Sequence, residues 1–167
     1  MGTAFEHKHD GDAAEVLNDE YVDAYLQIRE EPPYNSNLNS SRERCLERTR
    51  RQVDTPGFHL VSARDDDGRL IGWAFGLPFA AGRWWGGEST PAPEEVLQAE
   101  KFAVIELNVV KEHRGNGYGR RLLEELVRCP EPSGLGPKQG QRYSGKEARG
   151  EEAENISARV SARAEQR

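Results

Sequence analysis

Three glycines at alternate positions carry the clearest chemical signal in this sequence. Glycine lets the backbone turn tightly, so that several N–H groups can point into one concavity. A helix that follows such a turn adds the positive end of its dipole, and arginines add full charges. These residues predict a site for a pyrophosphate or a similar anion. The segment is Lys111-Glu112-His113-Arg114-Gly115-Asn116-Gly117-Tyr118-Gly119-Arg120-Arg121.

The segment differs from two common phosphate-binding motifs. No Gly-Lys-Ser/Thr occurs in the chain, so the P-loop pattern is absent. The dinucleotide fingerprint G-x-G-x-x-G fails because Arg120 stands where its last glycine would be. A glycine-rich turn that binds nothing is the alternative for so short a pattern.

The hydrophobic pattern predicts the elements that position this turn. Residues 102–110 are the most apolar run and predict a buried central strand, with Glu106 and Asn108 on one face. A helix with a leucine stripe begins near Gly117 and is stopped by Pro130.

Two helices and a hairpin are predicted before that strand. The first helix begins at Asp12 and is stopped by Pro32-Pro33, and the second covers about 39–53. Residues 58–63 and 70–77 predict a hairpin with an Asp-Gly connection.

Arginines crowd the predicted second helix and allow two interpretations. They form either a phosphate-binding patch or a solvated face whose charge Glu43 and Glu47 balance, and we favour the solvated face. The residues are Arg42, Arg44, Arg48, Arg50 and Arg51.

At the glycine turn the sequence resembles the GNAT family of acetyl-CoA-dependent N-acetyltransferases. The family signature Q/R-x-x-G-x-G/A stands here as residues 114–119, after the strand pattern Glu106-Leu107-Asn108-Val109 and before a leucine-rich helix. The resemblance covers about residues 12–128. It implies an α+β fold with a mixed, mostly antiparallel central sheet and flanking helices.

The resemblance also implies a reaction and a set of site residues. An acetyl group would move from acetyl-CoA to an amine, with the pantetheine arm held by backbone groups of Leu107 and Val109. Glu106 is the candidate base for the ammonium proton, and the alternative is an ion-paired or substrate-positioning carboxylate. The pyrophosphate would be held at Arg114, Gly115, Asn116, Gly117, Tyr118 and Gly119, with Arg120 nearby.

The chain departs from the family pattern after the glycine-turn helix. A GNAT domain continues with a strand, a helix and a closing hairpin, whereas residues 130–167 hold only Leu135, Ile156 and Val160 from the Leu/Ile/Val/Phe set. Such a segment cannot bury enough apolar surface to become ordered. The sequence therefore predicts a GNAT-like domain over 1–129, incomplete after this helix, and a low-complexity, disordered tail over 130–167.

Composition narrows the classes of function and partner. A net charge of −6 argues against nucleic-acid binding, and no apolar run approaches the ~18–20 residues of a membrane span. Cys45 and Cys129 are too few for a disulfide framework, which favours a reduced, cytoplasmic protein. His7 and His9 lack further ligands nearby, so no metal site is predicted.

Two functions from different classes stay open at this point. The first is an N-acetyltransferase that acts on a primary amine of a small molecule or peptide. The second is a non-catalytic CoA-binding remnant or interaction module. The sequence does not determine the oligomeric state, but an uncovered strand edge would allow a homodimer, because it can pair with a second chain.

Overall fold

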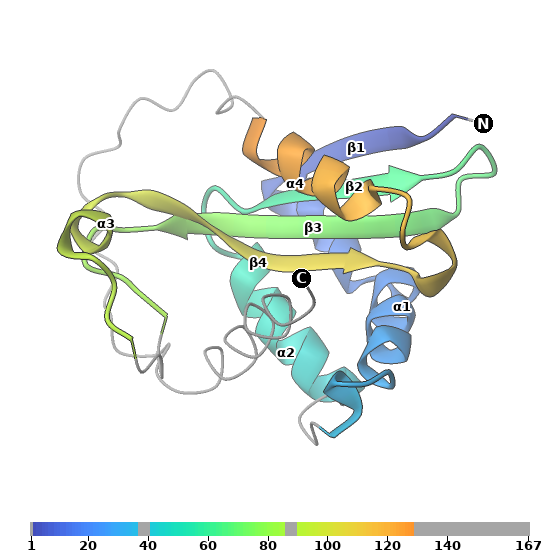
Figure 1. Ribbon diagram of the computed structural model, residues 1–167, viewed down its shortest axis with the longest axis horizontal. Coiled ribbons are helices and arrows are strands. Elements are labelled where there is room, and N and C mark those ends of the chain that lie inside the picture. Colours follow the sequence, from blue (N-terminus) through green and yellow to red (C-terminus); the bar gives the residue numbers. More distant parts are fainter. Residues whose placement is uncertain (1, 37–40, 86–89, 129–167) are drawn as a thin grey trace. The chain divides into compact units, whose positions relative to one another are not determined.

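The structure is a computed structural model that describes residues 2–36, 41–85 and 90–128 (Figure 1). The chain divides into two compact units. The first comprises Met1–Pro78 and Phe102–Arg128, and the described part of the second lies within Phe79–Lys101. The tail predicted over 130–167 lies outside the described residues.

A four-stranded antiparallel sheet forms the centre of the first unit. Its strands lie in the order β1-β2-β3-β4, and β1 and β3 both pair antiparallel with β2. The predicted α+β fold with a mostly antiparallel sheet is therefore confirmed. The strands are β1 (Ala4–His9), β2 (His59–Arg64), β3 (Leu70–Phe79) and β4 (Lys101–Val109).

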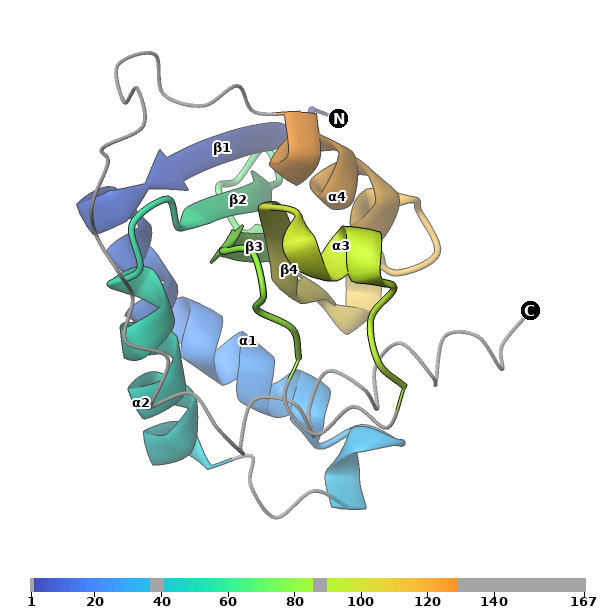
Figure 2. The same cartoon turned by 90° about the vertical axis from the view of Figure 1, so that its left-hand side faces the viewer.

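Helices cover both faces of this sheet (Figure 2). On one face the ring of Tyr21 from α1 meets Trp73 of β3 edge-on, at 5.6 Å between ring centroids. On the other face Leu122 and Leu126 of α4 are buried against residues of β2 and β3. The helices are α1 (Asp19–Arg29), α2 (Arg42–Val53) and α4 (Tyr118–Arg128).

The N-terminal region differs from the sequence prediction in two ways. Residues 4–9 form β1, although only Phe5 is a large apolar residue, because the strand is stabilised by pairing with β2. Asp10–Leu17 is a 3₁₀ helix, and α1 begins after Asn18 rather than at Asp12. The amide of Asn18 donates to the carbonyl oxygen of Glu15, which separates the two helical segments.

The small residues of β3 allow its neighbours to approach closely. A Cβ atom added at Gly72 would lie 2.5 Å from the carbonyl oxygen of Asn108 and 3.1 Å from a Leu122 methyl carbon. The space that a side chain at Gly72 would occupy is therefore taken by β4 and α4. This close packing fixes the strand and the helix on either side of the glycine turn.

The described part of the second unit is the excursion between β3 and β4. It contains the short helix α3 (Glu94–Gln98), and the amide of Gly82 donates to the carbonyl oxygen of Leu97 at 2.7 Å. The ring of Trp85 packs against Phe79, with centroids 4.8 Å apart. These contacts give the excursion local order of its own.

Candidate active site

The glycine turn connects β4, through a short 3₁₀ helix at Lys111–His113, to α4. Gly115 and Gly117 both have φ of +78°, a left-handed conformation that side chains rarely adopt. A Cβ atom at either glycine would meet nothing within 4 Å, so the space beside the turn is open. The first amides of α4 have no carbonyl one turn earlier to bind, and they carry the positive end of the helix dipole. The turn can therefore receive an anionic group.

Two side chains of the turn hold its backbone in shape. Arg114 donates from Nε to the carbonyl oxygen of Val109 at 2.9 Å, and its other nitrogens bind the carboxylate of Glu31. The hydrogen bond from Arg114, together with its charge, lowers the pKa of Glu31. The amide nitrogen of Asn116 donates to the carbonyl oxygens of His113 and Arg114, both at 3.2 Å. Both side chains act on the turn itself.

The remaining turn residues lie at the start of α4. Tyr118 is half-buried, and its hydroxyl is hydrogen-bonded to the hydroxyl of Thr3 at 3.1 Å. Arg120 is exposed and donates to Glu124 at 2.8 Å. Arg121 lies over the ring of Phe5, with its guanidinium carbon 4.6 Å from the centroid. Both arginines leave positive charge near the turn.

Strand β4 presents different residues to the two faces of the sheet. Leu107 and Val109 are half-buried and pack against the core beneath α4. Glu106 and Asn108 are buried, and the Asn108 amide donates to a Glu106 carboxylate oxygen at 3.0 Å. Within the described residues β4 is an edge strand, so one row of its backbone groups faces away from β3. Its backbone can therefore bind an extended ligand.

Two arginines, the buried Arg29 and the half-buried Arg48, face the carboxylate of Glu106. Nη2 of Arg29, at the end of α1, lies 3.7 Å from one oxygen, and Nη2 of Arg48, on α2, lies 3.7 Å from the other. The side chains of Arg29 and Glu106 are only 3% and 5% exposed. Burial disfavours the charge of Arg48, but the Glu106 carboxylate and Tyr25 outweigh it and raise the pKa of Arg48. Glu106 is thus the anionic centre of a buried ionic cluster.

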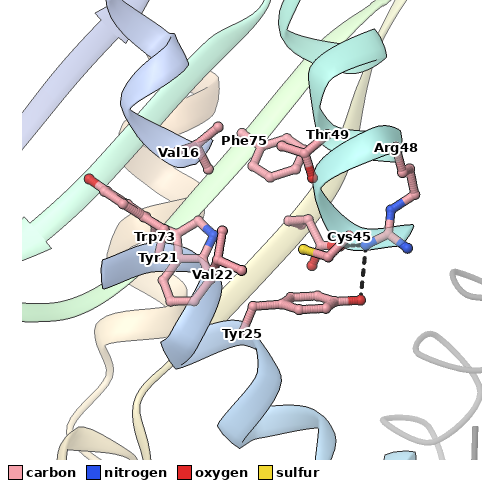
Figure 3. A pocket seen from close by; sticks show the side chains of 10 residues that line it. Val16, Tyr21, Val22, Tyr25, Cys45, Arg48, Thr49, Trp73 and Phe75 are labelled. Atoms are coloured by element: carbon pink, nitrogen blue, oxygen red, sulfur yellow. Dashed lines mark hydrogen bonds and ion pairs between the residues drawn. The ribbon is translucent and has the colours of Figure 1, made fainter. Parts of the chain in front are cut away.

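A small pocket opens beside this cluster, between α1, α2 and the sheet. Figure 3 shows Arg48 reaching towards the hydroxyl of Tyr25, to which it donates at 2.9 Å, with Cys45 and Thr49 nearby. The cavity volume is about 20 Å³, room for one water molecule. Its lining combines apolar and polar side chains: Val16, Tyr21, Val22, Tyr25, Cys45, Arg48, Thr49, Trp73, Phe75 and Glu106.

Neither Cys45 nor Tyr25 has the chemistry of a nucleophile in this pocket. Burial raises the pKa of the Cys45 thiol, which keeps it protonated near neutral pH. Burial, together with the charge of Glu106, also raises the pKa of the Tyr25 hydroxyl. The acidic and basic side chains that line the pocket are Glu106 and Arg48.

The model of the acetyltransferase (GNAT) family matches residues 15–134, which include the strand, the glycine turn and the helix after it. The chain belongs to the GNAT acetyltransferase family. No match was found among curated proteins.

Three solved GNAT-like structures resemble the chain. An aminoglycoside acetyltransferase from an uncultured soil metagenomic sample shares 16% identity, with 76% of this chain and 70% of that chain covered and a TM-score of 0.46. A ribosomal-protein-alanine N-acetyltransferase from Brucella melitensis shares 19% identity, with coverages of 76% and 70% and a TM-score of 0.41. The aminoglycoside 6'-N-acetyltransferase AAC(6')-Ih of Acinetobacter baumannii shares 12% identity, with coverages of 75% and 69% and a TM-score of 0.46.

The arginine partners of Glu106 in this GNAT chain were not predicted from the sequence. Arg48 was assigned to a solvated helix face, whereas it points inward, as Figure 3 shows. Its spacing carried a signal, because Arg48 follows the buried Cys45 by three residues and therefore shares its side of the helix. Other arginines of α2 fit the solvated interpretation, since Arg42 pairs with Asp19 and Asp23 at the surface.

Other site classes find no support in the described part of this GNAT chain. No group of three His, Cys, Asp or Glu residues there could hold a metal ion. His113 lies edge-on to Tyr118, beside the turn. No helix in the described ranges is long and apolar enough to cross a membrane.

Proposed function

We propose that this protein is an N-acetyltransferase that moves an acetyl group from acetyl-CoA to a primary amine of a small molecule or peptide. The observation that carries the proposal is the open glycine turn, which follows directly on the strand that bears Glu106. Family membership supports acetyl transfer in general. The donor and the amine are the parts that need testing.

The residues present fit an acyl-CoA. The left-handed glycines leave open space beside amides of the turn, which would hold the pyrophosphate at residues 114–119, with Arg120 nearby. The outer edge of β4 at Leu107 and Val109 would hold the pantetheine arm through backbone hydrogen bonds, although the carbonyl oxygen of Val109 already accepts one from Arg114. When bound, acetyl-CoA supplies a thioester whose C–S bond breaks as the new C–N bond forms.

Glu106 is the proposed proton acceptor. An ammonium group has no lone pair, so a base must remove a proton, directly or through a water molecule, before the nitrogen can form a bond. The cavity beside Glu106 has room for one such water. Asn108 donates to the same carboxylate and fixes its orientation.

A second role for Glu106 is favoured by the two guanidinium groups at 3.7 Å. A carboxylate that compensates two buried cations can organise the pocket without taking a proton. The amine would then lose its proton to water. Replacing Glu106 separates these roles, because only a proton acceptor there predicts a change in the pH dependence of turnover.

The test measures acetyl-CoA binding and thioester turnover separately on one preparation of the full chain. Calorimetry gives the affinity, and release of free thiol in the presence of varied primary amines gives the rate. Turnover supports the enzyme. Binding without turnover supports a non-catalytic CoA-binding module, and the absence of binding would overturn both.

A further inference from the structure

One ion pair ties the glycine turn to a distant part of the chain. Arg114 donates from Nη1 and Nη2 to the two carboxylate oxygens of Glu31, at 2.7 and 3.0 Å. Among the described residues, the other hydrogen bonds made by residues 113–117 stay within 109–121. Gly115 and Gly117 give this segment a large conformational freedom, which local bonds alone restrict poorly. Glu31 is therefore placed to restrict the turn from another element.

The guanidinium group of Arg114 is directed at the protein. All three of its nitrogens donate: Nε to the carbonyl oxygen of Val109 at 2.9 Å, and the other two to Glu31. An arginine held in this way fixes the end of β4 and the start of the turn against the end of α1. Its effect on a bound pyrophosphate therefore passes through the shape of the backbone.

The end of α1 holds Glu31 in place for this role. The carbonyl oxygen of Glu31 accepts from the amides of Tyr34 and Asn35, at 2.8 and 3.2 Å. Two residues earlier, Arg29 is buried against the ring of Tyr34 and lies 3.7 Å from Glu106. A carboxylate on an anchored backbone loses little freedom when it pairs with an arginine, so the pair can hold the turn at a small entropic cost.

We propose that Glu31 is a positioning residue for the acyl donor: through Arg114 it holds the glycine turn in the conformation that binds the pyrophosphate. This inference rests on the proposed function and adds to it a residue outside the family signature. In this role Glu31 itself does not touch the donor. Its contribution to donor binding depends on the guanidinium group of Arg114, so the two residues act as one unit.

The test is a double-mutant cycle for the binding of acetyl-CoA, measured by calorimetry on the full chain. Glu31→Gln should weaken binding about two- to fivefold, which is the effect of a partly exposed ion pair. In an Arg114→Gln background the same substitution should change the affinity no more than the control below, because its connection to the turn is gone. Glu31→Asp keeps the charge on a shorter side chain and should recover part of the affinity.

Glu30→Gln is the matched control, since it removes an exposed carboxylate from the neighbouring position. Loss of a negative charge near an anion site should by itself leave binding unchanged or slightly tighter, and this variant measures that effect. Calorimetry is run well below the melting temperature of every variant. All chains are then folded, so a loss of stability alone does not change the affinity.

Three results would overturn the inference while leaving the proposed function intact. The first is equal binding of acetyl-CoA by Glu31→Gln and Glu30→Gln. The second is tighter binding by Glu31→Gln than by the control, which would mean that a released Arg114 binds the phosphate directly. The third is an equal loss of affinity in both backgrounds. Absence of acetyl-CoA binding by the unchanged chain would overturn the proposed function and this inference together.

Discussion

Arg114 donates two parallel hydrogen bonds, 2.7 and 3.0 Å long, to the carboxylate of Glu31, which lies 83 positions away in the sequence. Glu31 lies just beyond α1, whereas Arg114 opens the glycine turn. The third bond of the guanidinium goes to the carbonyl oxygen of Val109 at the end of β4. The side chain of Arg114, the arginine of the family signature, therefore stabilises the conformation of the turn. The backbone amides and Arg120 remain available to bind an anion.

The ion pair between Arg114 and Glu31 should appear as a coupling energy between these two residues. In a double-mutant cycle of Glu31→Gln and Arg114→Gln, urea unfolding should give about 0.5–1 kcal/mol, because both side chains are partly exposed. The lowered pKa of Glu31 means that this contribution is present at neutral pH and is lost as the carboxylate becomes protonated in acid. A coupling energy near zero at low salt would contradict a stabilising role for this ion pair.

Gly117→Val should abolish acetyl-CoA binding. A β-branched side chain at φ +78° strains the backbone and fills the open space beside the turn. Gly68→Val is the matched control, since Gly68 has φ of +77° and open surroundings but lies in the β2–β3 connection. Both variants should lose similar stability by circular dichroism melts, and only Gly117→Val should lose affinity by calorimetry. Retained affinity would remove the turn from the anion site.

Glu106→Gln should lower turnover by about 10²–10⁴-fold if Glu106 accepts the ammonium proton, and acetyl-CoA binding should be kept. The acidic limb of the pH–rate profile should move in the same variant. Glu43→Gln, on the exposed part of α2, is the control.

A purely structural Glu106 predicts another pattern. Removing one partner of a buried ionic cluster costs about 3–5 kcal/mol, so unfolding would become easier while the pH–rate profile kept its shape. Urea unfolding and the pH profile therefore distinguish the two roles.

Stability should fall in mild acid because of His59. Burial, with nearby His9 and His7, lowers the pKa of His59 from 6.5 to about 4. The unfolded chain thus binds a proton more readily than the folded one, and stability decreases as the pH falls from 6.5 towards 4, by at most about 3 kcal/mol. A backbone hydrogen bond with Leu126 favours the protonated imidazole and partly offsets this lowering.

Melting temperatures measured across this pH range test the assignment. His59→Gln should flatten the dependence, while His113→Gln, beside the glycine turn, should leave it unchanged. An equally steep dependence in His59→Gln would assign the titration to other groups.

The elements from residue 102 onwards could be predicted because their signals are local. An apolar run, positive-φ glycines and a leucine stripe follow one another, and β4, the turn and α4 form in that order. Strand β1 could not be predicted, since its stability comes from pairing with residues 59–64. A strand that is stabilised by pairing with a distant segment shows only a weak strand pattern in its own sequence.

The same distinction holds at the site. Alternation along β4 predicted that Glu106 and Asn108 share a face, and their hydrogen bond confirms it. The arginines facing Glu106 come from helices more than 50 residues earlier, and only their spacing from buried neighbours hinted at burial. The base and cofactor-binding assignments stay predictions.

The hydrogen bond between Thr3 and Tyr118 has a consequence for how the chain is made. Its partners are 115 positions apart. At about 5–20 residues per second, the ribosome needs on the order of ten seconds to add Tyr118 after Thr3. Strand β1 is therefore synthesised long before α4, and its residues Phe5 and His7 can contact Arg121 and Glu125 only after that helix has been made.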